Sequence, residues 1–357
     1  MGFSHFKRNI APVVYTIAEQ LGYYRNWSRD ERRFSRREAV NFSGEIPPMA
    51  GTEFNQYRLK YDIPRNVIGS ASNVIYTAKG MGWVNGRLER RLSFQEVNLK
   101  HLLDKPSRPA RRLERGTILQ AQTPKTFGDW MSEHVSSLAI ALNRLGTLDP
   151  LILPSHWLAK PYVKRDLARL GIEAIAIDEP VEIAQATVLS KTRPGHYWTA
   201  AETDNLRKAL KVTPKPARPG SAVYLSRLGE KGEGPQRQMN NTLIEAAMMA
   251  AGVSIIRTAG RSLEEYLAAA GNAETVFADH GSAMYNLVYW QTKRVVELHS
   301  PDYWDGSFLM FADGLGIHDY HVWMVGETMT VDALRNRALY LLEKPIDHNQ
   351  APIMLAG

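Results

Sequence analysis

The sequence of 357 residues contains no cysteine and no long apolar run. Without cysteine the chain can form no disulfide, no thiolate metal site and no cysteine nucleophile, as is typical of proteins in a reducing cytoplasm. Without a run of about 18 apolar residues we expect no transmembrane helix, and the first residues lack the apolar core of a signal peptide. The sequence therefore predicts a cytoplasmic, globular protein.

The chain has fewer acidic than basic residues. It contains 37 aspartates and glutamates and 44 lysines and arginines, which gives a net charge of +7. Arginine is concentrated in residues 25–37 and 105–115. Such clusters are usually solvated surface, and the functional alternative is peripheral contact with the inner face of an anionic membrane. We expect no nucleic-acid partner, because the chain has no nucleic-acid motif and does not interleave basic with aromatic residues.

The length exceeds one ordinary core and suits two domains of about 100–200 residues each. We predict that residues 1–110 form an N-terminal α+β segment, with a helix over 5–22, a strand over 72–77 and a hairpin that turns at Asn85-Gly86. The glycines at positions 80, 82 and 86 do not form a dinucleotide-binding loop, because the third comes one residue too late and no amphipathic helix follows it.

From residue 116 onward, apolar strands alternate with amphipathic helices, a pattern typical of a mainly parallel sheet. The segment 211–220 contains three prolines and ends in glycine, so we interpret it as a linker. We therefore predict one domain over 111–210, a second over 211–330, and a C-terminal helix and tail over 331–357.

The individual elements follow from apolar runs and capping signals. Strands are expected at 117–121, 150–154, 173–178, 186–190, 221–226, 253–257, 275–279 and 294–299. Helices are expected over 131–145, over 160–170, after capping boxes at Thr242-Leu-Ile-Glu245 and Ser262-Leu-Glu-Glu265, and over 331–343.

The most informative segment is Asp279-His280-Gly281-Ser282-Ala-Met-Tyr-Asn286, between a buried strand and a helical stretch. Ligands in open α/β sheets bind beyond the carboxyl ends of the strands. Gly281 would let the backbone approach a phosphate, and Ser282 would begin a helix whose N–H groups and dipole favour an anion. His280 could hydrogen-bond a phosphate or a sugar hydroxyl. The alternative is a plain strand–turn–helix junction in which backbone groups satisfy the histidine.

Neighbouring strand ends carry further polar residues. Arg227 follows the strand over 221–226, and an arginine there can clamp phosphate oxygens. Arg237 and Asn240 lie in the loop before the next helix. Glu297 lies near the end of its strand, where a carboxylate can accept hydrogen bonds from both ribose hydroxyls. Together these residues predict a nucleotide-binding edge of the sheet.

Four strings occur in this order: Tyr224-Leu-Ser-Arg227, Arg237-Gln-Met-Asn240, His280-Gly-Ser-Ala-Met-Tyr-Asn286 and Val295-Val-Glu297-Leu. Through them the chain resembles glycosyltransferase family 61, whose usual strings are similar. A weaker likeness covers Thr126-Phe-Gly-Asp129-Trp-Met-Ser-Glu133-His134. Three positions depart from the family pattern: Asp129 replaces a common histidine, Ser282 replaces alanine, and Asn241 replaces an acidic residue.

The resemblance implies an α/β, GT-B-like fold, in which two Rossmann-like domains face each other across a cleft. It also implies an inverting transfer of a sugar from a nucleotide-sugar donor to a glycan or glycolipid acceptor, in bacterial capsule or lipopolysaccharide synthesis. Donor-binding roles would fall on Arg227, Arg237, Asn240, Gly281, Ser282, Asn286 and Glu297.

The chain has no Asp-x-Asp motif, so its residues do not support a metal–diphosphate site, and we expect neither a metal nor a cofactor. Arg227, helix N-termini and His280 would then neutralise the departing diphosphate. We interpret His318 and His321 as core or interdomain polar residues rather than zinc ligands.

An inverting transfer needs a base that takes the proton of the acceptor hydroxyl. Asp129 and Glu133 are four residues apart, one turn on a helix, so both could line the substrate cleft. His134 is a third candidate. Asp129 is expected at a helix start, where the alternative role is that of a cap.

Several alternatives stay open. Aromatic residues that could stack on an acceptor sugar are equally ordinary core material; they are His196-Tyr197-Trp198, Trp290 and Tyr303-Trp304. A degenerate transferase fold could serve as a non-catalytic scaffold in a polysaccharide assembly complex. A nucleotide-sugar epimerase would use the same strand ends without an acceptor.

Overall fold

The computed structural model describes seven main ranges of the chain: 66–89, 108–120, 126–191, 200–229, 239–258, 263–300 and 307–346. It also describes Leu92, Pro106 and four short strands, β1 (Tyr24–Arg25), β2 (Ser35–Arg37), β3 (Ser43–Gly44) and β4 (Tyr61–Ile63). The helix predicted over 5–22 lies outside the described residues. No helix in the part that the structure describes is long and apolar enough to cross a membrane.

The chain divides into two compact units. Unit 1 comprises Met1–Phe34, Pro64–Gly195 and Ala209–Lys211, and unit 2 comprises Ser35–Ile63, His196–Lys208 and Val212–Gly357. Residues 66–89 thus group with 111–191, whereas Ser35–Ile63 of the predicted N-terminal segment belongs to unit 2. The predicted domain limits themselves remain a prediction.

Unit 1 contains an eight-stranded sheet in the order β1-β7-β6-β5-β11-β8-β9-β10. Strands β8 to β11 run parallel to one another where they pair, as predicted, whereas β5, β6, β7 and β11 pair antiparallel. The sheet is therefore mixed. The strands are β5 (Asn66–Tyr76), β6 (Gly82–Val84), β7 (Arg87–Glu89), β8 (Arg111–Gln120), β9 (Leu151–Pro154), β10 (Ala174–Ile177) and β11 (Val181–Lys191).

The antiparallel part of this sheet begins at the predicted hairpin. Asn85 and Gly86 both have positive φ, 50° and 75°, as a two-residue turn that matches the twist of the flanking strands requires. Strands β6 and β7 pair on either side of this turn, which confirms the hairpin. Because β5 pairs antiparallel with both β6 and β11, the sheet is mixed rather than wholly parallel.

The helix predicted over 131–145 is interrupted. A short helix α4 (Phe127–Asp129) leads into a π-helix, η2 (Trp130–Val135), and then into α5 (Ser136–Leu145). Every residue of η2 is buried. Single turns of π-helix are rare and frequently lie at functional sites. The remaining helices of this unit that the structure describes are α6 (Ser155–Leu158) and α7 (Pro161–Leu170).

Unit 2 contains a six-stranded sheet, wholly parallel, in the order β13-β12-β14-β15-β16-β3. Its strands are β12 (Arg218–Ser226), β13 (Ser254–Arg257), β14 (Ala273–Asp279), β15 (Arg294–His299) and β16 (Asp319–Met324). Its helices are α8 (Ala200–Ala209), α9 (Asn241–Ala250), α10 (Leu263–Ala270), the 3₁₀ helix η4 (Ser282–Tyr289), α11 (Ser307–Gly314) and α12 (Val331–Glu343).

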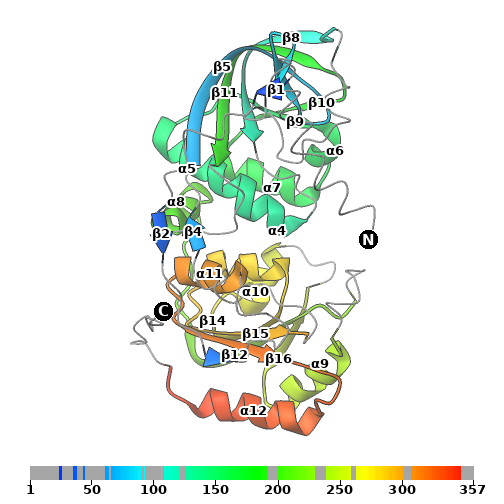
Figure 1. Ribbon diagram of the computed structural model, residues 1–357. Coiled ribbons are helices and arrows are strands. Elements are labelled where there is room, and N and C mark those ends of the chain that lie inside the picture. Colours follow the sequence, from blue (N-terminus) through cyan, green and yellow to red (C-terminus); the bar gives the residue numbers. More distant parts are fainter. Residues whose placement is uncertain are drawn as a thin grey trace. The chain divides into compact units, whose positions relative to one another are not determined.

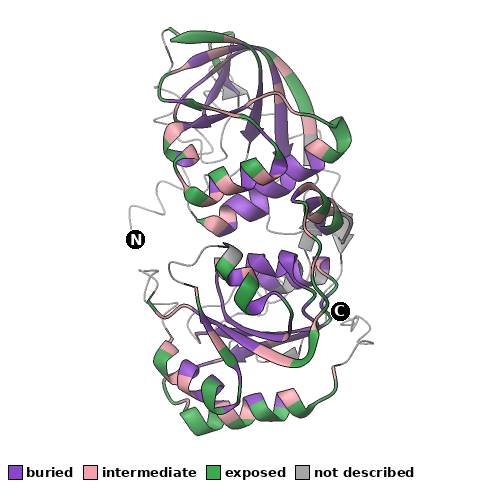
Figure 2. Cartoon of the chain, turned by 180° about the vertical axis from the view of Figure 1, so that it is seen from behind, coloured by how far each residue is buried: buried purple, intermediate pink, exposed green. Residues whose placement is uncertain are grey.

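Helices cover both faces of the parallel sheet. Figure 1 shows α9 and α12 on one face and α10 and α11 on the other. The core under α9 and α12 contains Ile244 and Leu334 packed against sheet residues such as Tyr224 and Val296. In Figure 2 the strands are mainly buried while α12 is largely exposed along its outer side. The molecule is thus a mixed α/β protein with one all-parallel sheet, consistent with a GT-B-like fold.

The predicted capping box at the start of α9 was wrong. The helix is capped by Asn240, which accepts a hydrogen bond from the Leu243 N–H, rather than by a box at Thr242. Glu245, the predicted partner in that box, instead pairs with Arg257. The helix is therefore capped two residues earlier than the sequence pattern indicated, with the same cap chemistry supplied by a nearby side chain.

Candidate functional site

The strand order of unit 2 places the polar strand ends at one point of the sheet. Strand β12 lies between β13 and β14, so the chain moves to one side of β12 with β13 and to the other side with β14. Strand order reverses at the gap between β12 and β14, and ligands of doubly wound sheets bind beyond the carboxyl ends of the strands at this position. Arg227 follows β12 directly, and His280 follows β14.

Arg227 and the His280-Gly281 turn contact each other. The pairing of Leu225 with Ala278 sets Arg227 level with His280. Arg227 Nη1 donates to the carbonyl oxygen of His280 over 3.0 Å. A Cβ atom added to Gly281 would lie 3.2 Å from the same Nη1, so glycine leaves the guanidinium space against the turn. Arg227 and the His280-Gly281 turn therefore lie at the same edge of the sheet, as the sequence predicted, and they are in direct contact.

Asp279 holds this arrangement together from inside the sheet, a role that the sequence did not reveal. One carboxylate oxygen accepts from the Tyr224 hydroxyl at 2.6 Å, and the other accepts from the Arg227 N–H at 3.0 Å and from the Asn241 amide. A carboxylate with several donors can remain charged when buried. Asn241 thus has a purpose that an acidic residue could not serve, because it would repel Asp279.

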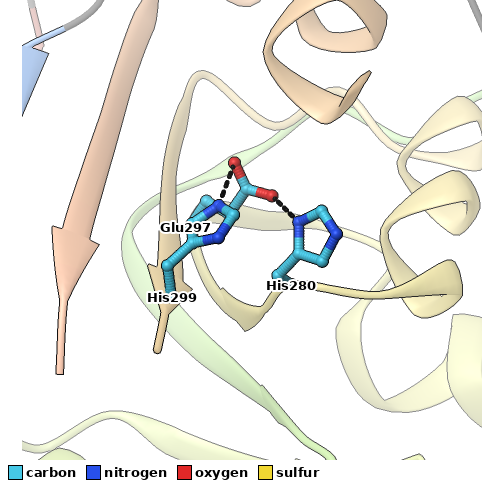
Figure 3. A group of neighbouring side chains, drawn as sticks. All are labelled: His280, Glu297 and His299. Atoms are coloured by element: carbon cyan, nitrogen blue, oxygen red, sulfur yellow. Dashed lines mark hydrogen bonds and ion pairs between the residues drawn. The ribbon is translucent and has the colours of Figure 1, made fainter. Parts of the chain in front are cut away.

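Glu297 lies at the centre of a second buried network (Figure 3). Its Oε1 accepts from His280 Nδ1 over 2.7 Å. Its Oε2 accepts from the Tyr320 hydroxyl over 2.7 Å and lies 3.1 Å from His299 Nε2. The residue is only 1% exposed. Both oxygens are thus occupied by the protein's own groups, so a ribose contact would have to displace one of them.

The charge state of Glu297 follows from its partners. Burial alone raises the pKa of Glu297, but the charge of His299 and the hydrogen bonds from His280 and His299 outweigh it and hold the pKa well below the usual range. Burial and the nearby Glu297 carboxylate raise the pKa of Tyr320 well above its usual value. The network is therefore a buried carboxylate anion held by two imidazoles and a phenol.

The same three residues could hold a metal ion. The ligand atoms of His280, Glu297 and His299 lie within 4.8 Å of one another, and two histidines with one glutamate form a familiar zinc set. In this structure their atoms contact one another directly, at 2.7 and 3.1 Å. An ion could enter only if those contacts opened.

The other predicted donor-binding residues occupy different surroundings. Gly281 precedes η4, with Ser282 as the first helical residue, half-buried, and Asn286 as a buried one. The helical stretch expected here is a 3₁₀ helix. Asn240 is exposed and caps α9. Arg237 lies outside the described residues.

The predicted bases lie on unit 1 and differ in exposure. Asp129 is half-buried, and its Oδ2 accepts from both the N–H and the hydroxyl of Thr126. This reciprocal capping box fixes the start of α4. Glu133 and His134, within η2, are almost fully buried. Of these three candidate bases, only Asp129 has a side chain that is partly exposed at the surface of the unit.

A buried aspartate supports η2 from the neighbouring helix. Asp166 on α7 accepts from Trp130 Nε1 over 3.0 Å and from Arg165 Nε over 2.7 Å. Trp130 in turn stacks on His134, with ring centroids 5.2 Å apart. Burial raises the pKa of Asp166, although the bonds from Arg165 and Trp130 oppose it. The sequence carried no sign of this contact, because its members come from two helices.

The aromatic and histidine alternatives are partly resolved. Trp290 is 1% exposed and stacks on Tyr266, so it belongs to the core. His321 contacts Asp319, which also binds Arg294, and this is a polar cluster within unit 2. The segments 196–198 and 303–304 lie outside the described residues.

Comparison with known proteins adds one match. The family model described as Glycosyltransferase 61 matches residues 127–296. The match spans α4 to β15 and so includes Asp129, Arg227 and His280, while Glu297 follows it directly. No curated protein matched the chain.

Proposed function

Because residues 127–296 form a glycosyltransferase family 61 domain, this protein is a glycosyltransferase, and we propose that it transfers a sugar from a nucleotide-sugar donor to a glycan or glycolipid acceptor. The observation that supports the donor site is the contact between Arg227 and the His280-Gly281 turn, at the point where strand order reverses. Sites of this kind receive nucleotides in many doubly wound sheets.

The donor's diphosphate would be bound at this contact. Arg227 supplies a forked cation, and its guanidinium is already oriented by the His280 carbonyl. The backbone N–H groups that begin η4, near Ser282, add partial positive charge. We assign further donor contacts to Arg237, Asn240 and Asn286.

The reaction would proceed with inversion and without a metal ion. The acceptor hydroxyl oxygen attacks the anomeric carbon, while the bond from that carbon to the diphosphate oxygen breaks and its electron pair leaves with the diphosphate. Asp129 takes the hydroxyl proton. Arg227 and His280 stabilise the negative charge that develops on the leaving group.

We place this activity in bacterial surface polysaccharide synthesis, within a GT-B architecture and at the cytoplasmic face of the membrane. Exposed arginines at the start of β8 support membrane contact, since an anionic surface attracts such side chains. They are Arg108, Arg111, Arg112 and Arg115. Two of these arginines also pair with acidic neighbours, Glu182 and Asp149, which weakens the attraction.

The donor site is tested by nucleotide binding. Arg227→Ala should weaken the binding of nucleoside diphosphates by about ten- to a hundredfold, because hydrogen bonds to charged groups contribute about 1.5–3 kcal/mol. Isothermal titration calorimetry with a panel of nucleoside diphosphates measures this. Arg227→Lys should recover part of the affinity.

Arg335→Ala is the matched control. It removes the same charge from the exposed face of α12, where Arg335 pairs with Asp332, and it should leave affinity unchanged. Equal affinity of wild type and Arg227→Ala, or equal loss in both alanine variants, would refute the assignment. Thermal unfolding of each variant identifies any loss that comes from misfolding.

A further inference from the structure

Glu297 does not have the surroundings of a ribose-binding carboxylate. Such a residue needs open oxygens at the surface, whereas Glu297 is 1% exposed, accepts from His280 and Tyr320, and has His299 Nε2 3.1 Å from its Oε2. These partners come from β15, β16 and the turn after β14, so three consecutive parts of the sheet meet at this carboxylate.

The contacts at Oε2 restrain the whole carboxylate. Tyr320 donates from β16, and His299 approaches from the end of β15 itself. With this oxygen held, Oε1 can point in only one direction, toward His280 Nδ1 (Figure 3). The second ring nitrogen of His280, Nε2, lies on the far side of the imidazole from Glu297.

The environment of His280 also favours a defined ring position. His299 lies beside it, with ring centroids 4.6 Å apart, and Phe308 of α11 meets it edge to face at 5.1 Å. Its backbone carbonyl accepts from Arg227. The side chain keeps 9% of its surface exposed. Among the residues that the structure describes, the charged and titratable groups around His280 are Glu297, His299 and Arg227, together with Tyr320 and Asp279 in the adjoining networks.

We propose that Glu297 is a positioning residue, which fixes the imidazole of His280 so that Nε2 donates a hydrogen bond to the departing diphosphate. This inference rests on the proposed function. A carboxylate at Nδ1 selects the ring orientation and stabilises the imidazolium form. An N–H donor that is already aimed at the developing charge stabilises the transition state without further reorganisation.

The proposal has a spectroscopic test that needs no substrate. Imidazole ¹⁵N NMR, with His280 assigned by comparison with His280→Ala, should show Nδ1 protonated in the wild type. Glu297→Gln should shift both ring-nitrogen signals of His280, because the charged acceptor is lost. Glu274→Gln, at the opposite end of the sheet on β14, should leave them unchanged. Identical His280 signals in wild type and Glu297→Gln would overturn the proposal.

Kinetics separate positioning from ribose binding. Glu297→Gln should lower kcat by about ten- to a hundredfold, the usual scale when an orienting partner is lost, with the donor KM and nucleoside affinity nearly unchanged. Tyr320→Phe is a milder variant that should fold reliably, shift the same signals and lower kcat less. A loss of nucleoside affinity in Glu297→Gln would restore the ribose role and refute positioning.

A metal site and a failure of the proposed function each give a distinct result. Stoichiometric zinc in the purified protein, lost in Glu297→Gln, would overturn the proposal in favour of a metal site. If no nucleotide sugar is turned over by the wild type, the proposed function fails, yet the NMR comparison still decides whether Glu297 sets the state of His280.

Discussion

Glu297 in unit 2 and Asp166 in unit 1 are both almost completely buried, yet their pKa values shift in opposite directions. Burial raises the pKa of each. At Glu297 the two histidines outweigh that cost and the pKa falls, whereas at Asp166 the bonds from Arg165 and Trp130 do not, and it rises. Burial alone therefore does not predict the direction in which the pKa of an acidic residue shifts; its partners decide that direction.

The difference matches what each carboxylate contacts. Glu297 binds a histidine at the edge of the sheet where strand order reverses. Asp166 binds an indole N–H beneath the π-helix and so joins two helices. We infer that the Glu297 carboxylate serves the chemistry of the site, whereas the Asp166 carboxylate serves packing.

The largest expected effect is on turnover, and it concerns a third carboxylate, that of Asp129. Asp129→Asn should lower turnover at least about a hundredfold, the scale of losing a general base, and leave donor binding intact. Asparagine keeps an oxygen for the Thr126 cap, so α4 should persist. Steady-state turnover and nucleotide calorimetry measure both quantities.

Asp166→Asn is the matched control in the same unit. It should leave turnover close to that of the wild type, because the amide oxygen still accepts from Trp130. Unchanged turnover in Asp129→Asn would remove Asp129 from the role of base. An equal loss in Asp166→Asn, without a fall in thermal stability, would break the distinction between a reacting and a packing carboxylate.

The next effect is a difference in how stability depends on pH. The folded-state pKa of Glu297 lies below its unfolded value, so its contribution is present above that unfolded value, about 4.3, and is lost as the pH falls. The folded-state pKa of Asp166 is raised, so its contribution is present at low pH and is lost as the pH rises through the folded value. Each group changes the slope by at most about 1.4 kcal/mol per pH unit.

Urea unfolding at a series of acidic to neutral pH values measures these slopes. Glu297→Gln should flatten the loss of stability in acid. Asp166→Asn should make the loss of stability in acid steeper, because the variant lacks the contribution of Asp166, which increases stability as the pH falls. Changes of slope with the same sign in the two variants would show that the comparison is wrong.

The smallest expected effect concerns Asn241. Asn241→Asp would set a second carboxylate against Asp279 and should lower the free energy of unfolding at neutral pH by about 1 kcal/mol. Asn241→Ala removes only the donor and should cost less. Urea unfolding compares the three proteins, and an aspartate variant as stable as the wild type would contradict the role assigned to the Asn241 amide.

Local patterns predicted most elements of the parallel sheet. The strand over 294–299 and the helix over 331–343 have the predicted bounds, and the helix is capped by Thr330. These signals are local, because an apolar run ends where turn residues begin and a cap lies beside the helix that it starts. The prediction failed where a nearby alternative satisfied the same backbone groups, as Asn240 does in place of Thr242.

The site was predicted as a set of strand ends rather than as a network. Arg227 and His280 were found because each follows an apolar strand. His299 and Tyr320 were missed, although polar side chains within buried strands need polar partners. The π-helix was missed as well, since the apolar stripe over 131–145 fits an ordinary helix equally well.

By itself, the sequence determined the alternation of strands and helices, the polar residues at the strand ends and the order of the motifs, because all of these depend on neighbours along the chain. Only the tertiary structure decided that β12 and β14 lie side by side. Only it decided that Glu297 is enclosed by partners 17 and 23 residues away, His280 and Tyr320. Lateral strand order and buried contacts arise from packing the whole unit, and no local period records them.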